Sequence, residues 1–124
     1  MKIIITAISD KIDQPFNPRF GRSDYFILID SETGEWQALA NPAVDARGGA
    51  GPQAVQFIAN QGVEAVISGR YGPSAYTALE AAGIQTFIAS SGTVNEVLQK
   101  FQAGQLEQVS NATGPELHGK RRAE

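Results

Sequence analysis

Residues 64–89 read EAVISGRYGPSAYTALEAAGIQTFIA, and this stretch predicts the fold class of the whole chain. It contains two apolar runs, 64–68 and 84–89, with a glycine-proline loop and a segment of helical apolar spacing between them. A strand, a helix and a second strand in this order require parallel strands joined by a right-handed crossover. The stretch therefore predicts an α/β domain.

The same alternation continues on both sides of this stretch. Before it, Pro52 suits the first turn of a helix that Gly62 closes. After it, Thr93 and Glu96 have the spacing of a capping box and predict a third helix, which ends at Gly104. Each predicted helix follows a loop that contains glycine.

Three more strands are expected before the first helix, at Lys2–Ile8, Tyr25–Asp30 and Glu35–Ala40. Ser31-Glu32-Thr33-Gly34 reads as a hairpin turn, so the second strand runs antiparallel to its neighbours. The predicted order is βββαβαβα, which gives a mixed sheet of five strands and three helices.

Composition limits the class of protein. The 124 residues fit one domain, expected at 1–109, followed by a flexible polar tail at 110–124. No apolar run approaches the roughly 20 residues of a membrane span, and no signal peptide is evident. The net charge of −3 does not favour nucleic acid, and the count of 0 Cys fits a cytoplasmic protein.

The predicted topology gathers four loops at one edge of the sheet. These loops, 9–23, 41–51, 69–72 and 90–92, follow or precede strand ends that lie at the same side. Open α/β sheets bind ligands at the carboxyl ends of their strands. We therefore expect the binding site at this edge.

Arginine placement indicates what this edge binds. Four of the six arginines lie in these loops, each near a glycine: Arg19, Arg22, Arg47 and Arg70. A single loop arginine is usually a solvated surface residue, but four at one edge favour a site. Guanidinium groups and glycine-preceded helix N-termini both recognise anions. The pattern predicts a pocket for a polyvalent anion.

Three segments together resemble the dinitrogenase iron-molybdenum cofactor biosynthesis family: NPRFGRSDYFILID (17–30), GGAGPQAVQFIANQGVEAVISGRYGPSAYTALEAAGIQTF (48–87) and GTVNEVLQKFQAGQL (92–106). The family includes nitrogenase accessory proteins and the orange protein, which carries a molybdenum–copper sulfide cluster. The resemblance implies a three-layer, ribonuclease H-like fold with sheet order 3-2-1-4-5. It also implies binding or transfer of an anionic metal–sulfur cluster, without catalysis, in exchange with cluster donor or acceptor proteins.

Placement and resemblance together give a set of candidate cofactor-binding residues: Arg19, Phe20, Gly21, Arg22, Arg47, Gly49, Gly51, Gly69, Arg70, Gly72, Ser91, Gly92 and Thr93. Many family members have histidine where this chain has Arg19, and many have one near the position of Arg47. The single histidine here, His118, lies in the tail. Without Cys or a histidine in the domain, we expect no direct metal ligand, and a cluster held by hydrogen bonds and charge.

An alternative function remains open. The same pocket suits a regulatory or phosphate-handling module that binds a nucleotide or another small anionic ligand, with Tyr71 and Trp36 either stacking on a base or packing in the core. A two-metal nuclease is disfavoured because the first strand carries no carboxylate. Serine hydrolysis is disfavoured because the domain has no histidine. We expect a monomer or a weak homo-oligomer.

Overall fold

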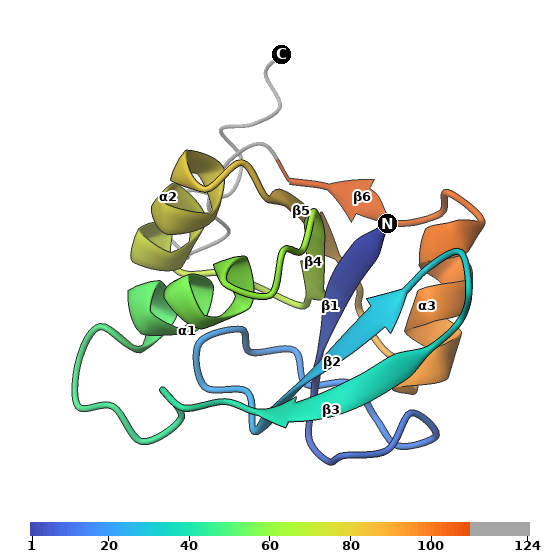
Figure 1. Cartoon of the computed structure of the whole chain (residues 1–124), viewed down its shortest axis with the longest axis horizontal. Coiled ribbons are helices and arrows are strands. Elements are labelled where there is room, and N and C mark those ends of the chain that lie inside the picture. Colours follow the sequence, from blue (N-terminus) through green and yellow to red (C-terminus); the bar gives the residue numbers. More distant parts are fainter. Residues whose placement is uncertain (110–124) are drawn as a thin grey trace.

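The central strand of the sheet, β1 (Lys2–Ala7), organises the fold of the computed structural model, which describes residues 1–109 (Figure 1). Five of its six residues are buried. It pairs antiparallel with β2 (Tyr25–Asp30) and parallel with β4 (Ala65–Ser68). Because both faces of β1 are covered, its sequence is a continuous apolar run rather than an alternating one.

The sheet has six strands in the described part of the chain, in the order β3-β2-β1-β4-β5-β6. The remaining strands are β3 (Trp36–Ala40), β5 (Gln85–Ile88) and β6 (Glu107–Gln108). The prediction of five strands is wrong, because β6 pairs antiparallel with β5 at the edge. A strand of two polar residues has no periodicity from which it can be recognised.

Within residues 1–109, three helices cover the sheet: α1 (Ala50–Ala59), α2 (Pro73–Ala81) and α3 (Val94–Gln102). α2 begins at the predicted proline, and the predicted capping box of α3 is present. α1 begins earlier than expected, since Gly49 is its N-cap with a left-handed φ of 70°. Gly51 is therefore a residue of the first helical turn and not of the preceding loop.

The helices divide between the two faces, which gives three layers (Figure 1). α1 and α2 pack over one face through Ala54, Ile58 and Leu79. α3 packs over the other through Val94 and Val97. The α/β class and the three helices were predicted from sequence.

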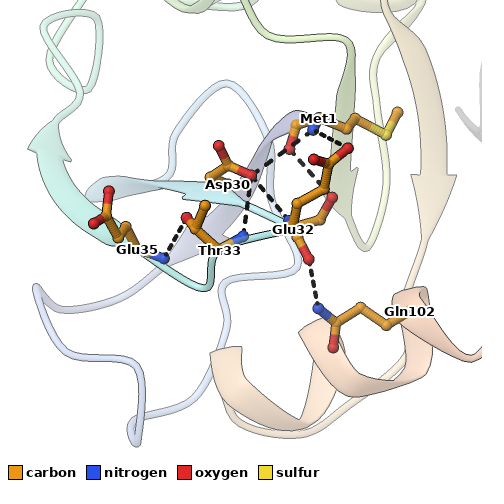
Figure 2. Close-up of polar contacts among 7 residues, drawn as sticks. Met1, Asp30, Glu32, Thr33, Glu35 and Gln102 are labelled. Atoms are coloured by element: carbon orange, nitrogen blue, oxygen red, sulfur yellow. Dashed lines mark hydrogen bonds and ion pairs between the residues drawn. The ribbon is translucent and has the colours of Figure 1, made fainter.

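The end of the sheet at the start of β1 is held together by polar contacts (Figure 2). The ammonium group of Met1 lies 3.8 Å from Asp30 Oδ1 and 3.6 Å from a carboxylate oxygen of Glu32. Gln102 Nε2 of α3 donates to the carbonyl of Ser31 at 3.1 Å. The amide of Glu32 donates to Asp30, and this hydrogen bond is the main reason that the pKa of Asp30 is lowered.

No helix within residues 1–109 is long and apolar enough to cross a membrane. The predicted tail at 110–124, including His118, lies outside the described residues.

Candidate functional site

A pocket of about 620 Å³ opens where β1 and β4 end. Three segments far apart in the sequence form its walls: 19–22 after β1, 49–52 at the start of α1, and 70–75 at the start of α2. The site therefore lies at the predicted edge of the sheet, on the face that α1 and α2 cover.

Arg19 and Arg70 are neighbours across this pocket wall. Their backbones form an isolated parallel bridge, and the amide of Arg70 donates to the carbonyl of Pro18 at 2.9 Å. A Cβ atom on Gly69 would lie 2.6 Å from Cβ of Pro18, so only glycine lets the two segments approach this closely. Both arginines are exposed, and neither forms an ion pair with a carboxylate of residues 1–109.

Two helix N-termini face the pocket without side-chain caps. In α1 the first amide bonded within the helix is that of Gln53, and in α2 it is that of Tyr76. Each helix has two earlier backbone amides, those of Ala50 and Gly51 in α1 and those of Ser74 and Ala75 in α2. None of these four amides has a hydrogen-bond acceptor within residues 1–109. Such amides, with the helix dipole behind them, favour an anion.

The N-terminus of α3 differs and does not reach the pocket. Its Thr93 hydroxyl accepts from the amide of Glu96 at 3.1 Å, and the Glu96 carboxylate accepts from the amide of Thr93. The next amides, of Val94 and Asn95, donate to the carbonyls of Gln14 and Ile12 at 3.0 and 2.9 Å. This helix end is closed by the protein itself.

Arg22 lines the pocket and also holds a neighbouring loop. Its Nη1 donates to the carbonyls of Val44 and Ala46 at 3.1 and 2.6 Å. Asn41 makes the reciprocal tie, since its Nδ2 donates to the carbonyls of Gly21 and Ser23 at 3.1 and 2.8 Å. Hydrogen bonds in both directions thus join the loop between β3 and α1 to residues 21–23.

The aromatic residues beneath the pocket belong to the core. Phe20 and Tyr71 are 2% and 1% exposed, and their ring centroids lie 5.6 Å apart. The Tyr71 hydroxyl donates to the carbonyl of Phe87 at 2.7 Å, and burial raises the pKa of Tyr71. Neither ring is available to stack on a nucleotide base, and Trp36 lies on β3 outside the pocket.

Comparison with known proteins identifies the family of this chain. The sequence profile of the dinitrogenase iron-molybdenum cofactor family matches residues 1–104. The chain belongs to this family. It is 32% identical over 111 residues to an uncharacterized protein of Methanocaldococcus jannaschii, covering 86% of this chain and 94% of that protein.

Solved structures of similar proteins share the fold. The apo form of the orange protein from Desulfovibrio gigas has a TM-score of 0.87 and 32% identity, covering 90% of this chain and 94% of the other. A NifB-like Thermotoga protein of the DUF35 family has a TM-score of 0.80 and 33% identity, covering 90% of this chain and 96% of the other.

Close packing connects the pocket walls of this family member. A Cβ atom on Gly51 would lie 2.9 Å from Cβ of Ala75, and one on Gly21 would lie 3.2 Å from the amide nitrogen of Gly51. These contacts join the segment 19–22 to α1, and α1 to α2. By contrast, a Cβ on Gly72 would meet no atom within 4 Å, so this position is open on the pocket side.

The pocket walls offer hydrogen-bond donors but no metal-ligating side chain of the usual kinds. The lining residues are Arg19, Phe20, Gly21, Arg22, Gly49, Ala50, Gly51, Pro52, Arg70, Tyr71, Gly72, Pro73, Ser74 and Ala75. They include no Cys, His, Asp or Glu. In residues 1–109, no group of three or more such residues is arranged to hold a metal ion. The arrangement suits recognition of the outer atoms of an anion.

The structure brings together eight of the thirteen residues expected at the site. Five others do not line the pocket. Gly69 supports it through its contact with Pro18. Arg47 lies in the loop that Arg22 holds, and the remaining three, Ser91, Gly92 and Thr93, lie at the closed end of α3. Of the residues with free amides, sequence reasoning missed Ala50, Ser74 and Ala75. For the last two, Pro73 at the first helical position signals that the next two amides are free.

Proposed function

We propose that this protein binds and carries an anionic metal–sulfur cluster as its cargo and that it is not an enzyme. The family is related to the iron-molybdenum cofactor, and the proposal assigns the cargo to the pocket between Arg19, Arg70 and the two uncapped helices. The cargo would be an iron–molybdenum–sulfur or a molybdenum–copper–sulfur cluster, received from donor proteins and delivered to acceptor proteins.

The pairing of Arg19 with Arg70 is the observation that carries the proposal. Two guanidinium groups anchored on adjacent backbone, with no carboxylate in the described chain to neutralise them, repel each other. A bound anion would relieve this repulsion. Four free helix amides at the same pocket would add neutral donors, which makes the site suited to several negatively charged oxygen or sulfur atoms.

The lining chemistry also indicates how the cargo would be held. Because the pocket lacks thiolate, imidazole and carboxylate groups, a cluster would keep its own complete set of ligands. Arg19, Arg70 and the helix amides would then donate hydrogen bonds to its outer sulfide or oxo atoms. Binding of this kind is non-covalent and depends on charge.

A second candidate, a small phosphorylated ligand, is favoured by one observation: uncapped helix N-termini bind phosphate well. A nucleotide fits less well, because the pocket presents no exposed aromatic ring for the base. This candidate would make the protein a regulatory or phosphate-handling module.

Anaerobic purification with metal analysis and visible absorption tests the proposal. A bound cluster gives charge-transfer bands above about 350 nm, which neither phosphate nor a nucleotide gives. For the isolated protein, calorimetric titration with tetrathiomolybdate, inorganic phosphate and ADP compares the candidates. We expect the thiometallate to bind most tightly. Preference for phosphate or ADP would instead support the phosphate-handling function.

Variants locate the binding site in the same titration. We expect Arg19→Ala combined with Arg70→Ala to weaken thiometallate binding at least tenfold. Lys11→Ala is a matched control, since Lys11 is an exposed cation outside the pocket that pairs with Asp10. Equal affinity of the double variant and the control would contradict the proposed site.

A further inference from the structure

The outer side of β3 carries unpaired backbone groups. Between β2 and β3, the backbone amide of Asp30 donates to the carbonyl of Glu35, and the backbone amide of Asn41 donates to the carbonyl of Asp24. The carbonyl of Glu35 and the amide of Asn41 therefore point toward β2. By the alternation of an antiparallel pair, Gln37 and Leu39 face β2 as well. The amides and carbonyls of Trp36, Ala38 and Ala40 therefore point away from the sheet, and no acceptor or donor in residues 1–109 pairs with them.

This edge lacks the features that usually keep strand edges apart. Residues 36–40 read WQALA, with no charged residue and no proline, and their register with β2 is continuous without a bulge. The opposite edge strand, β6, is only two residues long. β3 is thus the edge of this sheet that is open to pairing with another strand (Figure 1).

We propose that two copies of this chain associate by antiparallel pairing of β3 with β3 about a two-fold axis at Ala38. In this register Ala38 of each copy lies opposite Ala38 of the other, and Trp36 lies opposite Ala40. The unpaired backbone groups of residues 36, 38 and 40 in one copy then lie opposite those of the other copy, and they can form up to about six hydrogen bonds. The two sheets become one continuous sheet.

Other registers satisfy fewer groups. Moving the axis to Leu39 places Trp36 opposite Pro42, which has no amide hydrogen. Moving it to Gln37 places Ala40 opposite Gly34 in the hairpin turn. The register at Ala38 also avoids like charges, since Glu35 lies opposite the neutral Asn41.

Side-chain shape is consistent with the same pairing. Trp36 is 42% exposed and lines a groove of about 300 Å³ with Leu98 and Gln102 of α3. Opposite it, Ala40 of the second copy is small and leaves room for the indole. A large residue meets a small one at both symmetric positions, and a second copy would cover part of the exposed indole.

Two concentration series test the pairing with the unmodified protein. By sedimentation equilibrium between about 1 µM and 1 mM, the interval of a weak interface, we expect the mass to rise from 13.2 kDa to twice that value. Trp36 is the single tryptophan, so its emission should shift to shorter wavelength over the same interval. In hydrogen exchange, the amides of residues 36, 38 and 40 should gain protection with concentration, whereas those of 37 and 39 are protected throughout.

Charge substitutions test the axis itself. Ala38→Lys and Ala38→Glu each place like charges directly opposite one another, so each variant alone should be monomeric. Mixed in equal amounts, the two variants should pair. Gln37→Lys is the matched control, because residue 37 lies opposite Leu39 of the second copy, and it should still dimerise.

Several outcomes would overturn the proposal. A mass of one chain up to 1 mM means that β3 does not pair with itself. A dimer that survives Ala38→Lys uses another surface. Should residue 38 variants fail to fold by circular dichroism, the unmodified protein still decides: amides of residues 36, 38 and 40 that stay unprotected at high concentration would contradict pairing at this edge.

Discussion

The guanidinium group of Arg22 donates a hydrogen bond to the carbonyl of Ala46 at a distance of 2.6 Å. The same nitrogen donates to the carbonyl of Val44 at 3.1 Å. Arg22 was predicted as a residue of an anion-binding site, and it lines the pocket at the predicted edge of the sheet. The two hydrogen bonds give it a second task, because they fix the loop that leads into α1.

Replacing Arg22 with alanine should therefore loosen this loop. We expect the amides of residues 43–47 to exchange hydrogen several times faster in the ligand-free protein, because two charge-assisted bonds are lost. Arg22→Lys should restore part of the protection. Arg47→Ala is the control, since Arg47 makes no such bonds to residues 1–109, and equal exchange in both alanine variants would contradict the role of Arg22.

The pair formed by Arg19 and Arg70 should contribute to binding and not to folding. Both side chains are exposed and form no ion pair in the described chain, so the double alanine variant should keep the free energy of unfolding within about 0.5 kcal/mol. Urea unfolding measures this. A loss well above that value would mean that these side chains stabilise the pocket walls.

Substitution of two pocket glycines should affect different properties, namely stability at Gly51 and anion affinity at Gly72. Gly51→Ala places a Cβ 2.9 Å from Ala75 and should cost about 1–3 kcal/mol of stability through overpacking. Gly72→Ala meets open space with an ordinary extended backbone, so stability should change little while anion affinity falls. Gly48→Ala, also open but outside the pocket, should change neither quantity.

Gly51 is one of the residues expected to bind the cofactor, and the prediction for Gly51→Ala concerns its packing. Its missing side chain leaves room for Ala75 of α2. Wild-type stability in Gly51→Ala, measured by urea unfolding, would show that the helices separate easily at this point.

Arg19→His should change the mode of cluster binding. Arginine stays protonated and only donates hydrogen bonds, whereas a neutral histidine nitrogen can ligate a metal. Binding to the wild-type protein should weaken as salt rises, since exposed charges are screened over roughly 10 Å at 0.1 M ionic strength. The histidine variant should be less sensitive to salt and show a nitrogen neighbour by metal K-edge spectroscopy.

The wild-type spectrum provides the contrary case for this prediction. We expect no protein nitrogen in the first coordination sphere of the metal. A nitrogen ligand that persists after deletion of residues 110–124 would require a ligating group in the domain that the pocket walls do not contain.

Tyr71 should make the protein sensitive to alkali. Burial raises its pKa in the folded state, whereas an unfolded tyrosine titrates near about 10. Above that pH the unfolded chain releases the phenol proton and the folded chain retains it. The stabilising contribution is therefore complete below about pH 10 and is lost progressively as the pH rises further.

Urea unfolding between pH 8 and pH 11 measures the effect. Tyr71→Phe should be less stable at pH 8, because its hydrogen bond to Phe87 is absent, but its stability should fall less steeply with pH. Parallel curves for the two proteins would assign the alkaline loss to other groups.

The sequence predicted elements whose signals are local. The capping box of α3 and the proline at the start of α2 are read within a few residues, and both are present. β6 was missed because its pairing with β5 is decided by the tertiary structure. The early start of α1 was missed because the left-handed Gly49, and not Pro52, marks the boundary.

The position of the pocket was predicted to the extent that topology determines it. Strand order brings Arg19 to Arg70, since both follow strands that end at one edge. The closed N-terminus of α3 was not foreseeable, because its amides are taken by carbonyls of Ile12 and Gln14, about eighty residues earlier in the chain. The hydrogen-bond partners of Arg22, which are loop carbonyls, likewise depend on the tertiary structure and could not be predicted from sequence.

The contact between Gly69 and Pro18 constrains how this site can vary among related sequences. Any side chain at residue 69 would collide with backbone atoms of residue 18, so the two segments would have to separate. Separation would also part the arginines that follow them. A relative with another residue at the position of Gly69 should therefore have lost this pocket, so a residue that does not line the pocket would still determine whether it exists.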